Sequence, residues 1–165
     1  MKLVDNPATN PTDASEIRFA VAIHEAGHAI AFGVVGIDVL SVWIGSGSNP
    51  SGHTQSGEIV AAGRPDFLAT LYAGDMAVEE LCGGYRLPIV QSPASDHEQL
   101  RRSELELGIA DNERARAQVR ARQIVQTWHQ QVVALANALL AAPDGQLLGA
   151  DLDNQLAPVR EQFTE

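Results

Sequence analysis

The sequence predicts a mainly α-helical domain with a small β-hairpin or sheet, an α+β fold that spans residues 15–165 as a single domain. Three observations predict it. Residues 17–35 are apolar almost throughout, as in a buried helix, and residues 37–44 alternate between apolar and polar side chains, as in a half-buried strand. Residues 112–142 carry an apolar stripe at helical spacing. A chain of 165 residues is long enough to bury a sizeable core around these elements.

The composition narrows the class of protein. A net charge of −10 argues against a nucleic-acid partner, because phosphate binding needs a basic surface. Cys82 is the only cysteine, so no internal disulfide can form and a reducing compartment is expected. No apolar run approaches the roughly 20 residues of a membrane-spanning helix. We therefore expect a cytoplasmic protein without a membrane span.

Residues 1–14 are polar and contain two prolines, which predicts a flexible N-terminal lead. Asp13 or Ser15 is placed to cap the first helix, which we expect to end near Gly33 or Gly36.

The next segment, residues 37–44, is predicted to form a strand. Its pattern places three apolar side chains on one face, those of Leu40, Val42 and Ile44, and Ser41 and Trp43 on the other.

A glycine-rich loop follows, and residues 53–61 are expected to form the return strand of a hairpin. Pro65 lies in the first turn of a second helix that stops at Gly83. A third helix should begin at residues 95–98, which have the spacing of a capping box. One long helix then covers 112–142, and residues 147–159 predict a short closing helix.

The segment with the clearest chemistry is His24-Glu25-Ala26-Gly27-His28, inside the first helix. Residues four apart lie on the same helix face, so both imidazoles can reach one metal ion. Glu25 is close enough to contact a water bound to that metal. This H-E-x-x-H pattern is typical of zinc hydrolases, with two histidine ligands and a glutamate as general base. The alternative, histidines on a solvated helix face, fits poorly with the apolar residues around the whole helix.

A catalytic zinc ion needs three protein ligands and one open position for water. His24 and His28 provide two of them. The spacing of the remaining acidic and histidine residues leaves six candidates for the third: His53, Asp75, Glu79, Glu80, Asp96 and His97. One of Glu79 and Glu80 is expected to point inward, because both lie beside apolar residues of the second helix.

Three sequence blocks resemble the peptidase domain of the FtsH-type ATP-dependent zinc proteases. They are AIHEAGHA at residues 22–29, AGDMAVEEL at 73–81 and Ala94-Ser95-Asp96 before a helix, in the same order and at similar spacing. The likeness extends over about residues 17–160, although only these blocks are specific. It implies a zincin-like active-site helix within an FtsH-type peptidase fold.

The resemblance also addresses the third ligand. In that family it is an aspartate in the first turn of a later helix, in the sequence Ala-Ser-Asn-Asp, where this chain has Ala-Ser-Asp-His. Alignment on Ala-Ser places His97 at the ligand position. Alignment on the following helix pairs Asp96 with Leu100 and preserves a buried face, which favours Asp96. His97 stays as the alternative.

These features predict a zinc-dependent metalloendopeptidase in which Glu25 activates the zinc-bound water. The chain has no GxxxxGK[ST] sequence, so it is expected to be a stand-alone relative without its own ATPase. Peptides or unfolded proteins are then the expected substrates, and a separate ATPase is a candidate partner. The resemblance further implies that the strand at residues 39–44 borders the cleft and pairs with an extended peptide.

Two alternatives compete with this hypothesis. The first is a non-catalytic zinc-binding protein that keeps the peptidase fold to hold a peptide or regulate a partner. Retention of Glu25 speaks against it, because a structural zinc site needs no base. The second is a sequence-selective regulatory peptidase that cuts one partner protein. The sequence does not indicate the oligomeric state.

Overall fold

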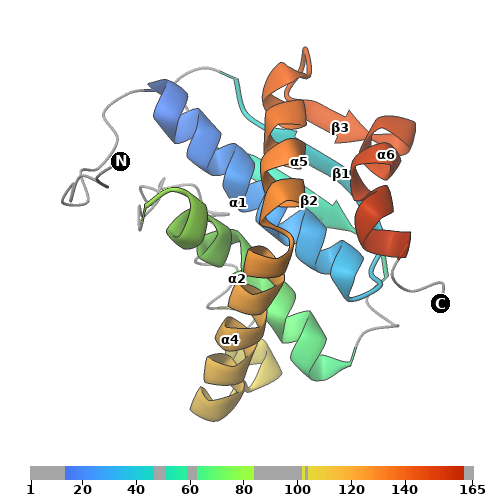
Figure 1. The fold of residues 1–165 in the computed structure, drawn as a ribbon. Helices are drawn as coiled ribbons and strands as arrows, with labels where there is room; N and C mark the ends of the chain where they lie inside the picture. The colour runs from blue at the N-terminus through green and yellow to red at the C-terminus, as the bar shows by residue number, and fades with distance from the viewer. Residues whose placement is uncertain (1–13, 47–50, 59–62, 84–101, 103, 162–165) are drawn as a thin grey trace.

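The computed structural model describes residues 14–46, 51–58, 63–83, 102 and 104–161. The elements in these ranges are mostly helices, with one small antiparallel sheet, which confirms the predicted α+β class (Figure 1). In chain order they are α1 (Ala14–Val34), β1 (Val39–Ile44), β2 (Gly52–Ser56), α2 (Arg64–Leu81), α4 (Asp111–Thr127), α5 (His129–Ala141), β3 (Gln146–Leu148) and α6 (Gly149–Arg160).

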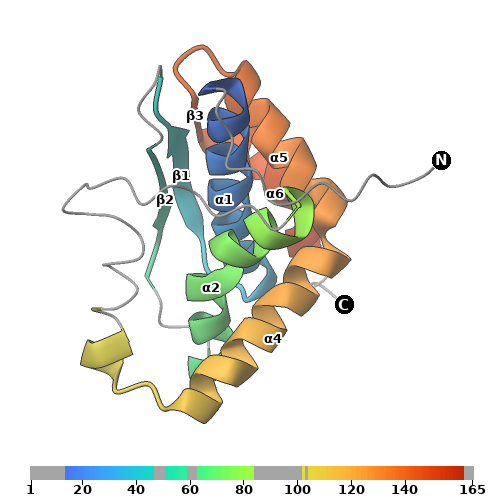
Figure 2. The same ribbon diagram turned by 90° about the vertical axis from the view of Figure 1, so that its left-hand side faces the viewer.

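Helix α1 occupies the centre of the molecule. It packs against the sheet on one side and against α2 and α5 elsewhere, and Figure 2 shows it between the sheet and α5. Residues 20–27 are all buried, so every face of this part of the helix is covered. The apolar sequence all round the helix explains this position, because an amphipathic helix would leave one face in water.

The sheet has the strand order β2-β1-β3, and both pairs are antiparallel. The register is irregular between Val39 and Ser41. As a result Val39 is buried while Leu40 is 51% exposed, so the expected inward position of Leu40 is wrong. A bulge of this kind adds a residue on one strand and reverses the side-chain alternation beyond it.

Residues 146–148 form a third strand, whereas the sequence predicted that the closing helix starts at 147. The strand lies between Gly145 and Gly149, which both have positive φ. At Gly145 a Cβ atom would lie 2.5 Å from the carbonyl oxygen of Ile44, so a larger residue does not fit. Three residues are too few to show the period of a strand, which is why the sequence pattern missed it.

The predicted long helix over 112–142 is divided at Trp128 into α4 and α5. The apolar stripe continues across the division, and its members fill the core together with α1. The buried residues of α4 and α5 are Ala117, Ala121, Ile124, Val125, Val132, Leu135, Ala136 and Leu139. Aliphatic and alanine side chains make up nearly all of this core, in line with an aromatic content of 5%. In the described part of the chain, no helix has the length and apolar character needed to cross a membrane.

Candidate metal centre

The two histidines of the motif lie side by side on α1. The Nε2 atoms of His24 and His28 are 3.1 Å apart, and the rings meet edge to face with an angle of 82° between their planes. Zinc–nitrogen bonds of about 2.0–2.1 Å at the tetrahedral angle separate two ligand nitrogens by about 3.4 Å. A zinc ion bound to both Nε2 atoms therefore requires them to move apart by only a few tenths of an ångström.

The other ring nitrogens face oxygen atoms of α2. Nδ1 of His28 lies 2.8 Å from the carbonyl oxygen of Thr70, and Nδ1 of His24 lies 3.5 Å from Oδ1 of Asp75. A carbonyl accepts and cannot donate, so Nδ1 of His28 carries the hydrogen and the neutral ring has its lone pair on Nε2. The Asp75 carboxylate faces the corresponding nitrogen of His24, at a distance longer than a usual hydrogen bond. Rings that carry their hydrogens on Nδ1 would present both Nε2 lone pairs to a cation placed between them.

Helix α2 can approach the imidazoles because residue 74 is glycine. A Cβ atom there would lie 2.5 Å from Nε2 of His28 and 2.7 Å from Cε1 of His24. Gly27 on α1 has a related role, because a Cβ would come within 2.7 Å of the carbonyl oxygen of Ala73. The two glycines thus allow α1 and α2 to pack closely at the histidine pair. The sequence analysis identified the block at residues 73–81, which contains Gly74, but it did not predict that this glycine allows the close packing of the two helices.

Glu25 faces the sheet. Its side chain is 2% exposed, and the hydroxyl of Thr54 on β2 donates to Oε2 at 2.6 Å. The same hydroxyl lies 3.1 Å from the main-chain carbonyl oxygen of Glu25. At Gly52 a Cβ would lie 2.6 Å from Oε1 of the carboxylate. The sequence predicted Glu25 as the base but gave no signal for Thr54 or Gly52, which belong to a short polar strand.

Three of the candidate third ligands lie away from the Nε2 pair. Glu79 and Glu80 are exposed on α2 and bind Arg122 of α4, at 3.0 Å and 2.9 Å. The expectation that one of them points inward is therefore wrong. His53 is exposed on β2, opposite Trp43 of β1.

Asp75 is near the site but on the wrong side of a ring, because it approaches Nδ1 of His24 and not Nε2. Asp96 and His97 lie outside the residues that the structure describes. Within the described residues, no group of three or more His, Cys, Asp or Glu side chains is placed to hold a metal ion. The histidine pair and the carboxylate nevertheless have the donor chemistry that zinc prefers.

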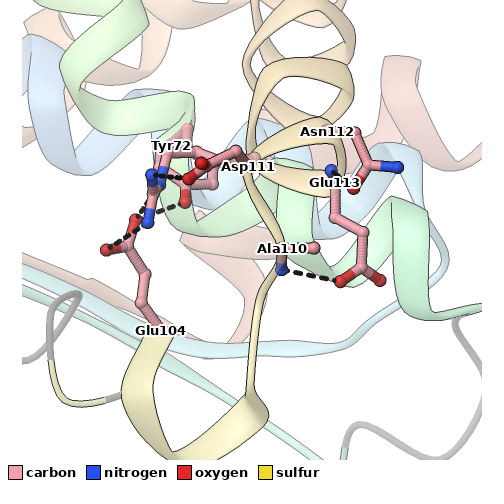
Figure 3. Close-up of polar contacts among 7 residues, drawn as sticks. Tyr72, Glu104, Ala110, Asp111, Asn112 and Glu113 are labelled. Carbon is pink, nitrogen blue, oxygen red and sulfur yellow. Dashed lines mark hydrogen bonds and ion pairs between the residues drawn. The ribbon is translucent and has the colours of Figure 1, made fainter.

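A partly buried polar cluster joins Glu104 to α2 and α4 (Figure 3). The Tyr72 hydroxyl of α2 donates to Oε1 of Glu104 at 2.6 Å, and Nε of Arg114 donates to the same oxygen at 2.9 Å. Burial, and then the Glu104 carboxylate, raise the pKa of Tyr72 to about 12, so the phenol stays protonated and remains a donor. Tyr72 lies on the same helix as Thr70 and Gly74, and the cluster therefore fixes the part of α2 that contacts the histidines.

Further ion pairs join α2 to α4. Arg64 binds Glu113 at 2.9 Å, and Arg120 binds Asp66 at 3.4 Å. Hydrogen bonds from Arg64 and from the Ala110 amide lower the pKa of Glu113 to about 2. Arg120 and Arg122 of α4 thus attach this helix to carboxylates of α2.

No protein-family model matches this chain, and a search of curated proteins found no match. Neighbouring imidazoles are common ligands of divalent metal ions, and a buried carboxylate beside such a pair has the chemistry of a general base.

Proposed function

We propose that this protein is a zinc-dependent metallopeptidase with an FtsH-type peptidase fold. The observation that carries the proposal is the 3.1 Å separation of the two Nε2 atoms, with both Nδ1 atoms turned toward oxygens of α2. Glu25, next to His24 and buried, adds the base that hydrolysis requires.

In the proposed mechanism His24 and His28 hold the zinc ion through Nε2. Asp96 is the proposed third ligand, and His97 is the alternative. A metal ion held there would lower the pKa of a bound water toward about 7 and would polarise the peptide carbonyl. Glu25 would accept a proton from the attacking water and would return it to the leaving amine.

The sheet topology changes the expected position of the substrate. β1 is the central strand, paired with β2 and β3, so its middle cannot also pair with a peptide and that expectation is wrong. In the described part of the chain, β2 pairs with β1 alone, and Thr54 of β2 contacts Glu25. We place an extended peptide along the outer edge of β2, held by main-chain hydrogen bonds. Peptides, exposed tails and already unfolded proteins fit such an edge, and a separate ATPase is the partner that would prepare folded substrates.

The test uses the zinc-loaded protein and a mixed peptide library, with Glu25→Gln as the control. The wild type should bind about one zinc ion per chain and cleave peptides. Glu25→Gln should retain the zinc and lose cleavage, because an amide cannot accept the proton from water. Cleavage by the Gln variant would show that Glu25 is not the base. A zinc-loaded wild type that cleaves nothing would instead support a non-catalytic zinc-binding protein.

A further inference from the structure

We propose that Thr54 is a positioning residue that holds the general base Glu25 in its working orientation. The inference rests on the proposed peptidase function and adds a residue from the sheet to it. The contact that carries it is the 2.6 Å hydrogen bond from the Thr54 hydroxyl to Oε2 of Glu25. This distance lies within the range of about 2.5–2.7 Å that is usual for a hydroxyl bound to a carboxylate.

The position of the Thr54 hydroxyl is determined by the sheet. Thr54 lies opposite Val42 of β1, and Val42 is completely buried. A β-branched side chain such as threonine has restricted rotation about χ1, so a fixed backbone also fixes the hydroxyl. The hydroxyl also lies 3.1 Å from the main-chain oxygen of Glu25, so both the side chain and the main chain of Glu25 contact β2.

Gly52 completes the arrangement two residues earlier on the same face of β2. A side chain at this position would collide with Oε1 and Cγ of Glu25, both 2.6 Å from the ideal Cβ position. The strand therefore holds one carboxylate oxygen with a hydroxyl and leaves space beside the other. This assigns Oε2 to the Thr54 hydrogen bond and Oε1 to the proton transfer. Oε1 would then take the proton from the attacking water and give it to the leaving amine nitrogen, which would restore the carboxylate.

The first test compares Thr54→Val, which has nearly the same shape but no hydroxyl, with Thr54→Ser, which keeps the hydroxyl. The substrate is a fluorescence-quenched peptide chosen from the library products of the wild type. Thr54→Val should keep one zinc ion and a KM near the wild-type value, while kcat falls about tenfold to a hundredfold. Thr54→Ser should restore most of kcat. Thr127→Val, at an exposed position on α4, is the matched control and should behave as wild type.

A Thr54→Val protein with wild-type kcat would overturn the inference, and so would a Ser variant that loses as much activity as the Val variant. Either result alongside an active wild type would leave the peptidase proposal intact. If the zinc-loaded wild type cleaves no peptide, the peptidase proposal and the positioning role fail together.

A second test needs neither metal nor substrate. Urea unfolding of the metal-free wild type, Thr54→Val, Glu25→Leu and the double variant measures the coupling between the two side chains. If the hydrogen bond forms as described, the effects on the unfolding constant should depart from additivity by about fivefold or more. Additive effects would overturn the contact itself, whatever the protein cleaves.

Discussion

The carbonyl oxygen of Thr70 lies 2.8 Å from Nδ1 of His28, so helix α2 determines which nitrogen of this ring carries the hydrogen. Thr70 is completely buried, and its hydroxyl donates to the carbonyl of Phe67 at 2.7 Å. The backbone around Thr70 is therefore firmly placed. Metal affinity should depend on α2 for this reason, although the two proposed histidine ligands both belong to α1.

Replacement of Gly74 by alanine should weaken zinc binding by about tenfold or more, because the added methyl group meets both imidazoles. Competition with a chromophoric chelator measures the affinity. Gly63→Ala is the matched control, since Gly63 has a φ of −61° and its Cβ would meet its nearest neighbour at 3.8 Å. Equal affinity of the two variants would mean that the rings tolerate a displacement of α2.

Replacement of Asp75 by asparagine should lower zinc affinity by about tenfold, because the carboxylate beside Nδ1 of His24 favours the tautomer with a free Nε2. Asp66→Asn controls for the change of charge, because Asp66 lies on the same helix as Asp75 and loses only an exposed ion pair with Arg120 of α4. The same chelator competition applies. An Asp75→Asn protein with wild-type affinity would show that the carbonyl on His28 is sufficient to orient the pair.

The third ligand can be identified by metal analysis of two neighbouring variants. Asp96→Ala should bind less than the roughly one zinc ion per chain of the wild type, whereas His97→Ala should keep its zinc. The expectation follows from the alignment that keeps Leu100 on a buried helix face. The reverse pattern would assign the ligand to His97.

The Arg64–Glu113 pair should make stability depend on pH in the acid range. The pKa of Glu113 is lowered to about 2 from an ordinary value of 4.5. A lowered pKa means that the folded state binds the proton more weakly than the unfolded state, so the pair stabilises the fold above pH 4.5 and the effect is lost as the pH falls toward 2.

Urea unfolding of wild type and Glu113→Gln between pH 6 and pH 2 provides the measurement. The difference in unfolding free energy between the two proteins should shrink as the pH falls. A difference that stays constant over this range would mean that the ion pair contributes nothing measurable, as is common for exposed pairs.

Much of the fold follows from local patterns in the sequence. The apolar segment around His24 predicted α1, and Pro65 predicted the start of α2 to within a residue. The division at Trp128 and the strand β3 escaped prediction. The apolar stripe continues through Trp128 and so gives no signal for the division there. The strand β3 is defined by its pairing with β1, which is distant in the sequence.

The candidate site divides in the same way. His24, Glu25 and His28 stand out because their spacing carries chemistry within one helical turn. Thr54 and Gly74 are ordinary residues in sequence, and their roles arise only when β2 and α2 pack against α1. The sequence made Asp75 a candidate metal ligand. The structure shows instead that its carboxylate approaches Nδ1 of His24 and not Nε2.

Helix α1 lies between two layers, and successive residues on a helix point about 100° apart. The histidines consequently contact α2, whereas Glu25 contacts β2. Mutations should therefore be able to change the zinc affinity without the turnover rate, or the turnover rate without the zinc affinity. Changes on α2 should alter how tightly zinc is kept, and changes on β2 should alter how fast a metal-loaded protein works, so the two properties can be adjusted independently around one helix.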